Sequence, residues 1–281
     1  MEDWDLVIEP RSNIFQLRIK EIWNYRYLLV MFVKRDIVSV YKQTILGPIW
    51  FFIQPILTTI TFVVIFGNIA QISTDGLPQI LFYLAGITVW NYFSETLTAT
   101  SNTFIANANI FGKVYFPRLI LPISKVISGI IKFGIQFALF LLTLGFFIIK
   151  GSAIHPNILG IIIVTPIVLI IIAFLALGLG LILSALTTKY RDLNFLITFA
   201  IQLGMYATPV IYPLSSLHSK YKVFITANPM SSLVEGFRKV YLGAGSLSWP
   251  AIAYSLSFAL IILILGVIVF NSFEKTFMDT V

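Results

Sequence analysis

The sequence predicts an all-α, polytopic membrane protein with six transmembrane helices, an N-terminal amphipathic helix at the membrane interface and short re-entrant helices before the last span. Composition is the first observation behind this prediction. Hydrophobic residues make up 58% of the 281 residues, and charged residues make up only 11%. An average soluble domain has about 45–50% apolar and about 25% charged residues. The composition therefore excludes a water-soluble enzyme, because a soluble fold could not cover so much apolar surface.

The spacing of the charges is the second observation. Uncharged stretches of 32, 17, 38 and 34 residues follow Lys42, Lys132, Lys150 and Lys239. A helix needs about 20 apolar residues to cross a bilayer. The six predicted spans are residues 47–69, 77–99, 119–149, 158–186, 195–212 and 251–270.

Two of these spans carry patterned residues. Lys125 and Lys132 lie seven residues apart on one face of the third span, near its charged end. In the fourth span, Ala176, Gly180 and Ser184 place a small residue at every fourth position. Such a stripe allows another helix to approach closely, which predicts a packing role.

The N-terminal region predicts a helix that does not span. Between residues 13 and 27, Phe15, Ile19, Ile22 and Trp23 recur at helical spacing, with basic residues elsewhere on the helix. This pattern is typical of a helix lying on the membrane surface, although a helix packed against the rest of the protein has the same pattern. We therefore divide the chain into residues 1–30, a cytoplasmic N-terminus with this helix, and residues 31–281, the membrane domain.

The distribution of basic residues predicts the orientation. The N-terminal segment, the loops at 106–118 and 187–194 and the C-terminal tail hold 12 Lys and Arg residues, whereas the opposite loops hold 5. Cytoplasmic loops carry the excess of basic residues in membrane proteins. Both termini are therefore expected in the cytoplasm.

The residues needed for catalysis are not found together in the sequence. It has no cysteine, and its two histidines, His155 and His218, have no partner at ligand spacing, so neither a metal nor a cofactor is expected. A phosphate-binding loop needs Gly-x-x-x-x-Gly-Lys-Ser/Thr. The only Gly-Lys pair, at 112–113, has Asn107 in place of the first glycine and is followed by Val114. We expect no enzyme activity and no ATP binding by such a loop.

Basic and aromatic residues gather before the first span. Arg35, Tyr41, Lys42 and Gln43 precede Gly47-Pro48, which begins or bends that span. They form a candidate membrane entrance. Ordinary snorkelling side chains at the interface would explain the same residues.

Two short cytoplasmic loops combine aromatic and charged residues. The first contains Lys113, Tyr115, Phe116 and Arg118, and the second contains Tyr190, Arg191 and Asp192. Exposed residues of these types suit docking to a soluble partner. By composition alone, plain connecting loops are equally consistent with the sequence.

The outer segment from residue 213 to 242 is too polar to span and too apolar for a solvated loop. Asn228-Pro229 divides it into two short helices, and helices of this kind can seal a pathway at the outer face of the membrane. Glu235 and Arg238 follow at a spacing that predicts an ion pair on the helix surface.

The second predicted span is unusually polar and aromatic. Glu95 is an acid well inside it, and Trp90, Tyr92 and Phe93 precede it. An intramembrane carboxylate normally faces a bundle interior or a watery cavity, and aromatic faces can stack on sugar rings. We interpret these four residues as pathway lining. In the alternative, Glu95 lies near the cytoplasmic interface and pairs with a lysine there.

These same segments carry a family resemblance. The motifs at 41–50, 113–118, 190–193 and 228–230, the last followed by Glu235 and Arg238, resemble those of the membrane permeases of bacterial polysaccharide ABC exporters. This is the type 2 ABC export-permease family, and the O-antigen branch is the most similar. The likeness covers essentially the whole chain.

The resemblance implies a permease homodimer in the bacterial inner membrane, joined by two separate ATPase subunits that bind ATP and Mg²⁺. It implies that the two cytoplasmic loops dock into the ATPases and that the halves of the outer segment act as periplasmic gate helices. The implied substrate is a polysaccharide on a polyprenyl diphosphate lipid.

Two other functions stay open. The first is export of a drug or a simple lipid by the same kind of permease. The second is a membrane-embedded glycosyltransferase, which needs an acidic metal-binding pair in a loop. Asp192 is the only acid in the two internal cytoplasmic loops, which argues against the second.

Overall fold

The computed structural model describes residues 19–42, 47–111, 116–152, 154–190 and 192–277, and within these residues every regular element is a helix. The elements in chain order are α1 (Ile19–Asn24), α2 (Arg26–Tyr41), η1 (Gly47–Ile49), α3 (Trp50–Phe62), η2 (Val63–Ile69), α4 (Gln79–Ser101), α5 (Thr103–Phe111), α6 (Ile120–Ile149), α7 (Ile158–Lys189), α8 (Leu193–Tyr206), η3 (Leu214–Ser216), α9 (Ser219–Ala227), α10 (Pro229–Leu242) and α11 (Trp249–Phe277). The predicted all-α class is confirmed.

Within the described residues, four helical stretches are long and apolar enough to cross a membrane. They are Trp50–Ile69, Ile120–Ile149, Ile158–Lys189 and Trp249–Ser272, which match the first, third, fourth and sixth predicted spans. The predicted second span forms α4, with 23 residues but more polar side chains. The predicted fifth span forms α8, whose 14 residues extend over about 21 Å, less than a hydrocarbon core of about 30 Å.

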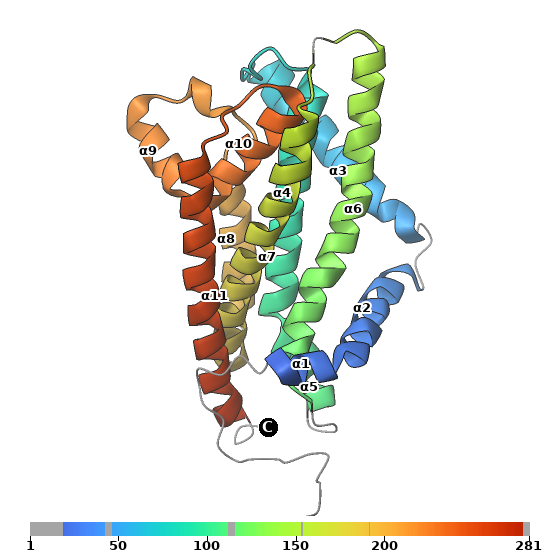
Figure 1. Ribbon diagram of the computed structural model, residues 1–281, viewed down its shortest axis with the longest axis vertical. Coiled ribbons are helices and arrows are strands. Elements are labelled where there is room, and N and C mark those ends of the chain that lie inside the picture. Colours follow the sequence, from blue (N-terminus) through green and yellow to red (C-terminus); the bar gives the residue numbers. More distant parts are fainter. Residues whose placement is uncertain (1–18, 43–46, 112–115, 153, 191, 278–281) are drawn as a thin grey trace, which may run out of the picture.

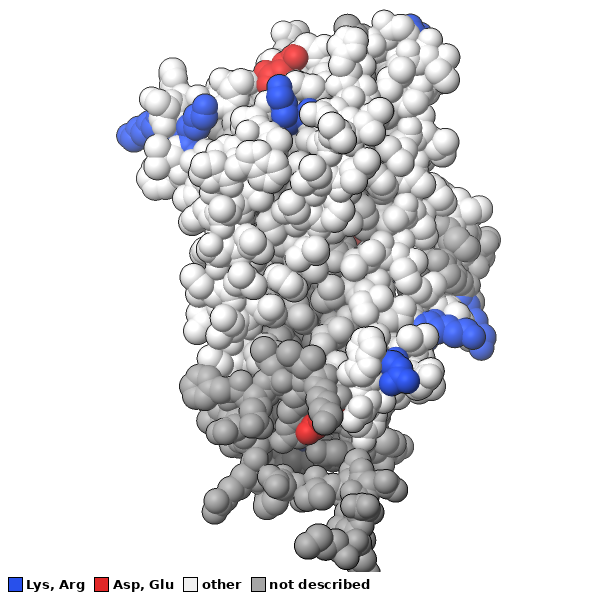
Figure 2. Space-filling view, viewed as in Figure 1, with Lys and Arg blue, Asp and Glu red and all other residues white. Residues whose placement is uncertain are grey.

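The long helices stand side by side with α4 and α7 in the middle of the bundle (Figure 1). α6 and α3 lie on one side of α4, and α11 packs along α7. Sixteen of the 23 residues of α4 are buried, because helices cover it on several sides. A helix so enclosed can carry polar side chains without exposing them to lipid. On the face in Figure 2, charged side chains gather toward the two ends and leave the middle almost entirely uncharged.

Glycines set the closest helix contacts. A Cβ atom on Gly180 would lie 2.5 Å from the side chain of Thr100 on α4, which confirms a close approach at the predicted stripe. The sequence did not single out the contact between α7 and α11. There a Cβ on Gly178 would lie 2.7 Å from the backbone of Ile262, and a Cβ on Gly266 would lie 2.4 Å from the carbonyl oxygen of Gly178. The two backbones touch without side chains between them.

The first span changes its helix type before it ends. α3 is continuous with η2, a seven-residue π-helix in which hydrogen bonds join residues five apart. The Ala70 amide donates to the Ile65 carbonyl at 2.8 Å, and Gln71 then adopts a left-handed backbone with φ of 50°. This wide turn ends the span.

Part of the predicted N-terminal helix lies at residues 13–18, outside the described residues. The described part forms α1 and α2, so the predicted boundary at residue 30 falls within α2. Trp23 and Tyr27 are 70% and 75% exposed, as a helix with an aromatic face toward the membrane requires. Phe32 and Val33 of α2 are instead buried within the chain.

Candidate functional site

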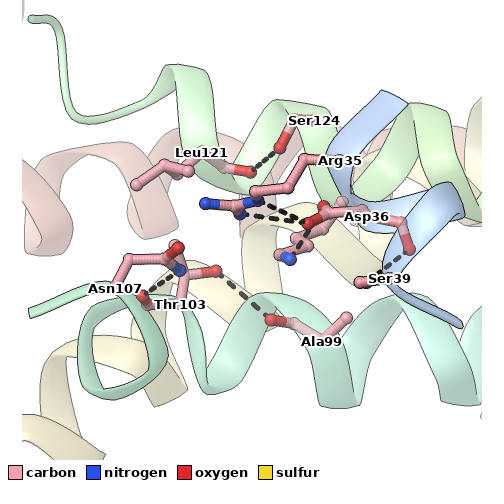
Figure 3. A network of polar contacts seen from close by, with 9 residues as sticks. Arg35, Asp36, Ser39, Ala99, Thr103, Asn107, Leu121 and Ser124 are labelled. Atoms are coloured by element: carbon pink, nitrogen blue, oxygen red, sulfur yellow. Dashed lines mark hydrogen bonds and ion pairs between the residues drawn. The ribbon is translucent and has the colours of Figure 1, made fainter. Parts of the chain in front are cut away.

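The candidate membrane entrance is built around Asp36 of α2. Its carboxylate pairs with Arg35 on the same helix, at 3.0 Å, and with Lys125 of α6, at 2.7 Å. Figure 3 shows the Arg35 guanidinium directed at the Asp36 carboxylate, with Ser39 one turn further along α2. Lys42 is exposed, whereas Gln43 and the side chain of Tyr41 lie outside the described residues.

Glu95 of α4 belongs to a second polar group, which is formed by residues of α4 and α6. Its Oε2 lies 3.6 Å from the Nζ atom of Lys132, and its Oε1 accepts a hydrogen bond from Gln136 at 3.4 Å. Gln136 in turn accepts a hydrogen bond from Asn91 at 3.1 Å. The lysine pair expected in the alternative interpretation is present. Glu95 also borders a cavity of about 190 Å³, and its role as pathway lining stays a prediction.

The four predicted pathway residues do not share a face of α4. Trp90 and Phe93, with ring centroids 5.3 Å apart, border an apolar cleft of about 270 Å³ next to α8. Tyr92 instead packs against Phe133 of α6, on the side of Glu95. Successive residues of a helix are about 100° apart, so Trp90 and Tyr92 must face nearly opposite directions. The four residues therefore lie on two faces of α4, with Trp90 and Phe93 on one face and Tyr92 and Glu95 on the other.

The first of the two loops predicted to be cytoplasmic is partly packed into the chain. Phe116 is 5% exposed and its ring lies 5.7 Å from that of Phe32, while Arg118 is 8% exposed. The expectation of exposed aromatics is wrong for Phe116, because its ring joins the apolar cluster beneath α2. Lys113 and Tyr115 lie outside the described residues.

The described residues of the second loop predicted to be cytoplasmic are open to their surroundings. Tyr190 is 52% exposed and Asp192 is exposed, as docking to a partner requires. The Lys189 ammonium lies 5.3 Å from the Tyr190 ring. Arg191 lies outside the described residues.

The ion pair of the outer segment is buried, so the prediction of a surface pair is wrong. Glu235 and Arg238 have exposed fractions of 2% and 1%, and their side chains approach to 3.6 Å. α10 is enclosed by α4, α7 and α11, which a short window of sequence cannot reveal. Lys239, the next residue after Arg238, donates to the Gly243 carbonyl.

Arg238 connects α10 to two other segments. Its guanidinium donates hydrogen bonds to the carbonyl oxygens of Pro209 and Val210, which follow α8, and to that of Phe82 on α4. It also lies 3.7 Å from the centre of the Phe82 ring. Burial raises the pKa of the Glu235 carboxyl and lowers that of Arg238 to about 10, because both charges lose contact with water.

Asn228 and Pro229 start α10 as the sequence predicts. The Asn228 side chain caps the helix by accepting from the amide of Met230 at 3.0 Å. The same side chain donates to the Ala207 carbonyl and to the Thr208 hydroxyl, so it also holds the end of α8. Pro229 occupies the first turn, where its missing N–H costs nothing.

Sequence reasoning missed several polar residues around Asp36 and Glu95. Thr96, Ser128 and Gln136 are buried there between α4 and α6. The seven-residue spacing of Lys125 and Lys132 was the signal that could have found them, since both lysines face this region. Among the described residues, no group of three or more acidic, histidine or cysteine side chains could hold a metal ion.

Comparison with known proteins places the whole chain in one family. A family model described as ABC-2 type transporter matches residues 27–242. An O-antigen export system permease protein of Klebsiella pneumoniae is 27% identical over 94% of this chain and 99% of its own length. The corresponding protein of Myxococcus xanthus is 28% identical over 79% of this chain and 83% of its own length, and a polysialic acid transport protein of Escherichia coli is 20% identical over 88% and 93%. The family model covers most of the chain, and the chain has several helices long and apolar enough to cross a membrane. This protein therefore belongs to the ABC-2 type transporter family.

Proposed function

We propose that this chain is the transmembrane permease subunit of an ABC exporter that moves a polysaccharide linked to polyprenyl diphosphate across the bacterial inner membrane. The similarity to O-antigen export permeases along nearly the full length of both chains is the observation that carries this proposal. ATP hydrolysis is assigned to two separate subunits, because the sequence has no phosphate-binding loop of the Gly-Lys-Ser/Thr type.

Six spans complete the proposed membrane domain. α4 is long enough to cross, and its enclosed position accounts for its polar residues. α8 is short, but the residues that follow it are buried and extend it toward the outer face. The excess of basic residues supports cytoplasmic termini, with α1 and α2 at the inner surface and α9 and α10 as the periplasmic gate helices.

A second copy of the chain is part of the proposal. Phe195, Phe199 and Leu203 are 83%, 59% and 50% exposed along one side of α8. Leu57 and Ile60 of α3 are also more than half exposed. A pathway for a polymer between two copies would place α3 and α8 around it, with these apolar side chains against the second copy rather than against lipid.

The second cytoplasmic loop is the proposed contact with the ATPase. We predict that Arg191→Glu leaves membrane insertion and dimerisation unchanged but abolishes ATP-driven export, because it reverses a charge at the docking point. Export is measured as surface polysaccharide, and insertion as the amount of protein in the membrane fraction. Wild-type export by this variant would reduce the loop to a plain connector.

Deletion of the gene in its native host tests the proposed substrate. Loss of the permease should trap polyprenyl-linked glycan on the cytoplasmic side and remove the polymer from the cell surface. Re-expression of the wild-type chain should restore both, whereas the Arg191→Glu variant should restore neither.

Export of a drug or a simple lipid is the second candidate. The apolar cleft beside Trp90 favours it, because apolar side chains line most of that cleft. This candidate predicts normal surface polysaccharide in the deletion strain together with hypersensitivity to an apolar drug. Under the first candidate, Trp90→Ala should instead slow export of long glycans only partially, since one aromatic contact contributes about 1 kcal/mol.

A further inference from the structure

A polar cavity lies between α2, α4 and α6. Its volume is about 190 Å³, and its lining includes four charged residues, Asp36, Glu95, Lys125 and Lys132. A liquid water molecule occupies about 30 Å³, so the cavity has room for a polar group several times larger. Such a concentration of charge is unusual in a chain with only 11% charged residues.

Two buried hydroxyl groups line the same cavity. Thr96 and Ser128 are 1% and 4% exposed, and neither hydroxyl has a hydrogen-bond partner among the described residues. Two other hydroxyls of these helices, those of Thr98 and Ser124, donate to carbonyls of their own helices. A buried polar group without a partner costs about 1–3 kcal/mol. These two hydroxyls therefore provide unused donors at the cavity wall.

The lysines add charged donors to the same wall. Lys125 is held at 2.7 Å by Asp36, whereas Lys132 lies 3.6 Å from Glu95 and is 29% exposed. Lys132 is therefore the ammonium group most readily shared with a ligand. The two lysines and two acids of the lining balance in charge. Arg35 does not line the cavity, but it also pairs with Asp36 and so adds one positive charge beside it.

The close approach of α4 and α6 leaves no room for a side chain beside one of these hydroxyls. A Cβ atom on Gly129 would lie 2.4 Å from the Oγ1 atom of Thr96. Any larger residue at this position would therefore cover or displace the Thr96 hydroxyl at the cavity wall. The geometry thus combines neutral and cationic donors around one small volume.

We propose that this cavity binds the phosphate group of a lipid. Phosphate oxygens accept hydrogen bonds from hydroxyl and ammonium groups, and bonds to charged partners are the stronger kind. α2 supplies one wall of the cavity. The proposed function, on which this inference rests, places α2 at the inner membrane surface, at the level of the lipid headgroups. An ordinary phospholipid and the polyprenyl diphosphate carrier share the required chemistry.

Binding to the purified full-length chain in detergent tests the proposal. The probes are undecaprenyl diphosphate and dioleoylphosphatidylglycerol, each compared with its phosphate-free counterpart, undecaprenol or dioleoylglycerol. We expect dissociation constants at least about tenfold lower for the phosphate lipids, because a hydrogen bond to a charged group contributes about 1.5–3 kcal/mol. Lys132→Met should weaken their binding by about the same factor. Lys150→Met, at the far end of α6, is the matched control and should change binding less than about twofold.

Further variants separate binding from folding. Thr96→Val and Ser128→Ala keep charge and nearly keep shape, and each should weaken phosphate binding severalfold. Lys132→Met combined with Glu95→Gln removes both charges of the pair and should still bind poorly. Gly129→Ala should weaken binding by covering the Thr96 hydroxyl.

The two lipid sources give different supporting results. Phosphate-dependent binding of both lipids identifies a phospholipid site, and binding of the diphosphate alone identifies a site for the carrier. Equal binding of the phosphate-free lipids, or equal binding by the Lys132→Met and Lys150→Met variants, would overturn the proposal. The measurement needs neither an ATPase nor export, so its failure is distinguishable from failure of the proposed function.

Discussion

α9 and α10 differ sharply although Asn228 alone separates them along the chain. α10 has eleven buried residues, including a charged pair, whereas α9 has none. Figure 1 shows α10 against the bundle and α9 projecting to its side. Both sequences mix apolar residues with lysine, so composition does not separate them. Contacts separate them, because α10 is tied to α4, α7, α11 and the end of α8.

The contrast suggests that α10 is the fixed half of the proposed gate and that α9 is the half free to move. Asn228 at the start of α10 and Arg238 in its second half both connect this helix to other elements. On α9, Tyr221, Val223 and Phe224 are between 60% and 74% exposed, so the fold itself does not specify their neighbours. We expect substitutions in α10 to lower stability and substitutions in α9 to alter export alone.

Arg238→Met should have the largest effect. It removes the hydrogen bonds to three carbonyl groups and leaves Glu235 buried without its cation. Breaking one side of a buried pair costs about 3–5 kcal/mol. We expect severe loss of folded protein in the membrane fraction and a large fall in the apparent Tm. The double variant Arg238→Met/Glu235→Gln should recover part of the loss, and an unchanged Tm for the single variant would show that the pair is dispensable.

Gly86→Ala should have the next largest effect. A Cβ atom at this position would lie 2.6 Å from the Nη2 atom of Arg238 and 3.1 Å from the Val210 carbonyl oxygen. Overpacking of this kind costs about 1–3 kcal/mol. Gly134→Ala is the control, because nothing lies within 4 Å of a Cβ there. Equal apparent Tm values for the two variants would mean that Arg238 is not confined at Gly86.

Asn228→Ala should have a moderate effect. The side chain caps α10 and also donates to the end of α8. Loss of an N-cap costs about 1 kcal/mol, so we expect a smaller fall in apparent Tm than for Gly86→Ala. Asn228→Asp should retain the cap but lose the two donated hydrogen bonds. If Asn228→Asp matches the wild type, the link to α8 contributes nothing.

Phe224→Ala should have the smallest effect on stability. The side chain is 74% exposed, and such substitutions usually change stability by less than about 0.5 kcal/mol. If α9 is a gate helix, as proposed, Phe224→Ala should nevertheless change the length distribution of surface polysaccharide, measured by gel electrophoresis. A fall in apparent Tm comparable to that of Asn228→Ala would show that α9 is packed as firmly as α10.

Features set by local composition were predictable from the sequence. The long apolar spans, the start of α10 at Asn228-Pro229 and the glycine contact at Gly180 depend on short patterns, and each is found. The burial of Glu235 and Arg238 was not predictable, because their i,i+3 spacing is the same on a surface helix. Only the packing of distant helices around α10 determines whether this pair is buried or lies on the surface.

The candidate site shows the same division. Glu95 was found because an acid within an apolar stretch is conspicuous. Its neighbours Thr96 and Ser128 are ordinary small residues, and their importance comes from their location beside two lysines. The aromatic residues around Trp90 were grouped by their closeness along the chain, which ignored the rotation of a helix.

The π-helical end of the first span affects how related chains are compared. A π-turn contains more residues than an α-turn of the same span, so η2 acts as a small insertion within an otherwise regular helix. Suppose that a relative has a regular α-helix here and therefore fewer residues in this turn. In an alignment without a gap, each residue after Val63 would then be paired with a residue that faces about 100° away around the helix axis for every extra residue in η2. Gly67, buried in this chain, would then align with a residue that faces lipid. An alignment with such a relative would therefore need a gap inside an apolar stretch, where hydropathy gives no signal for placing one.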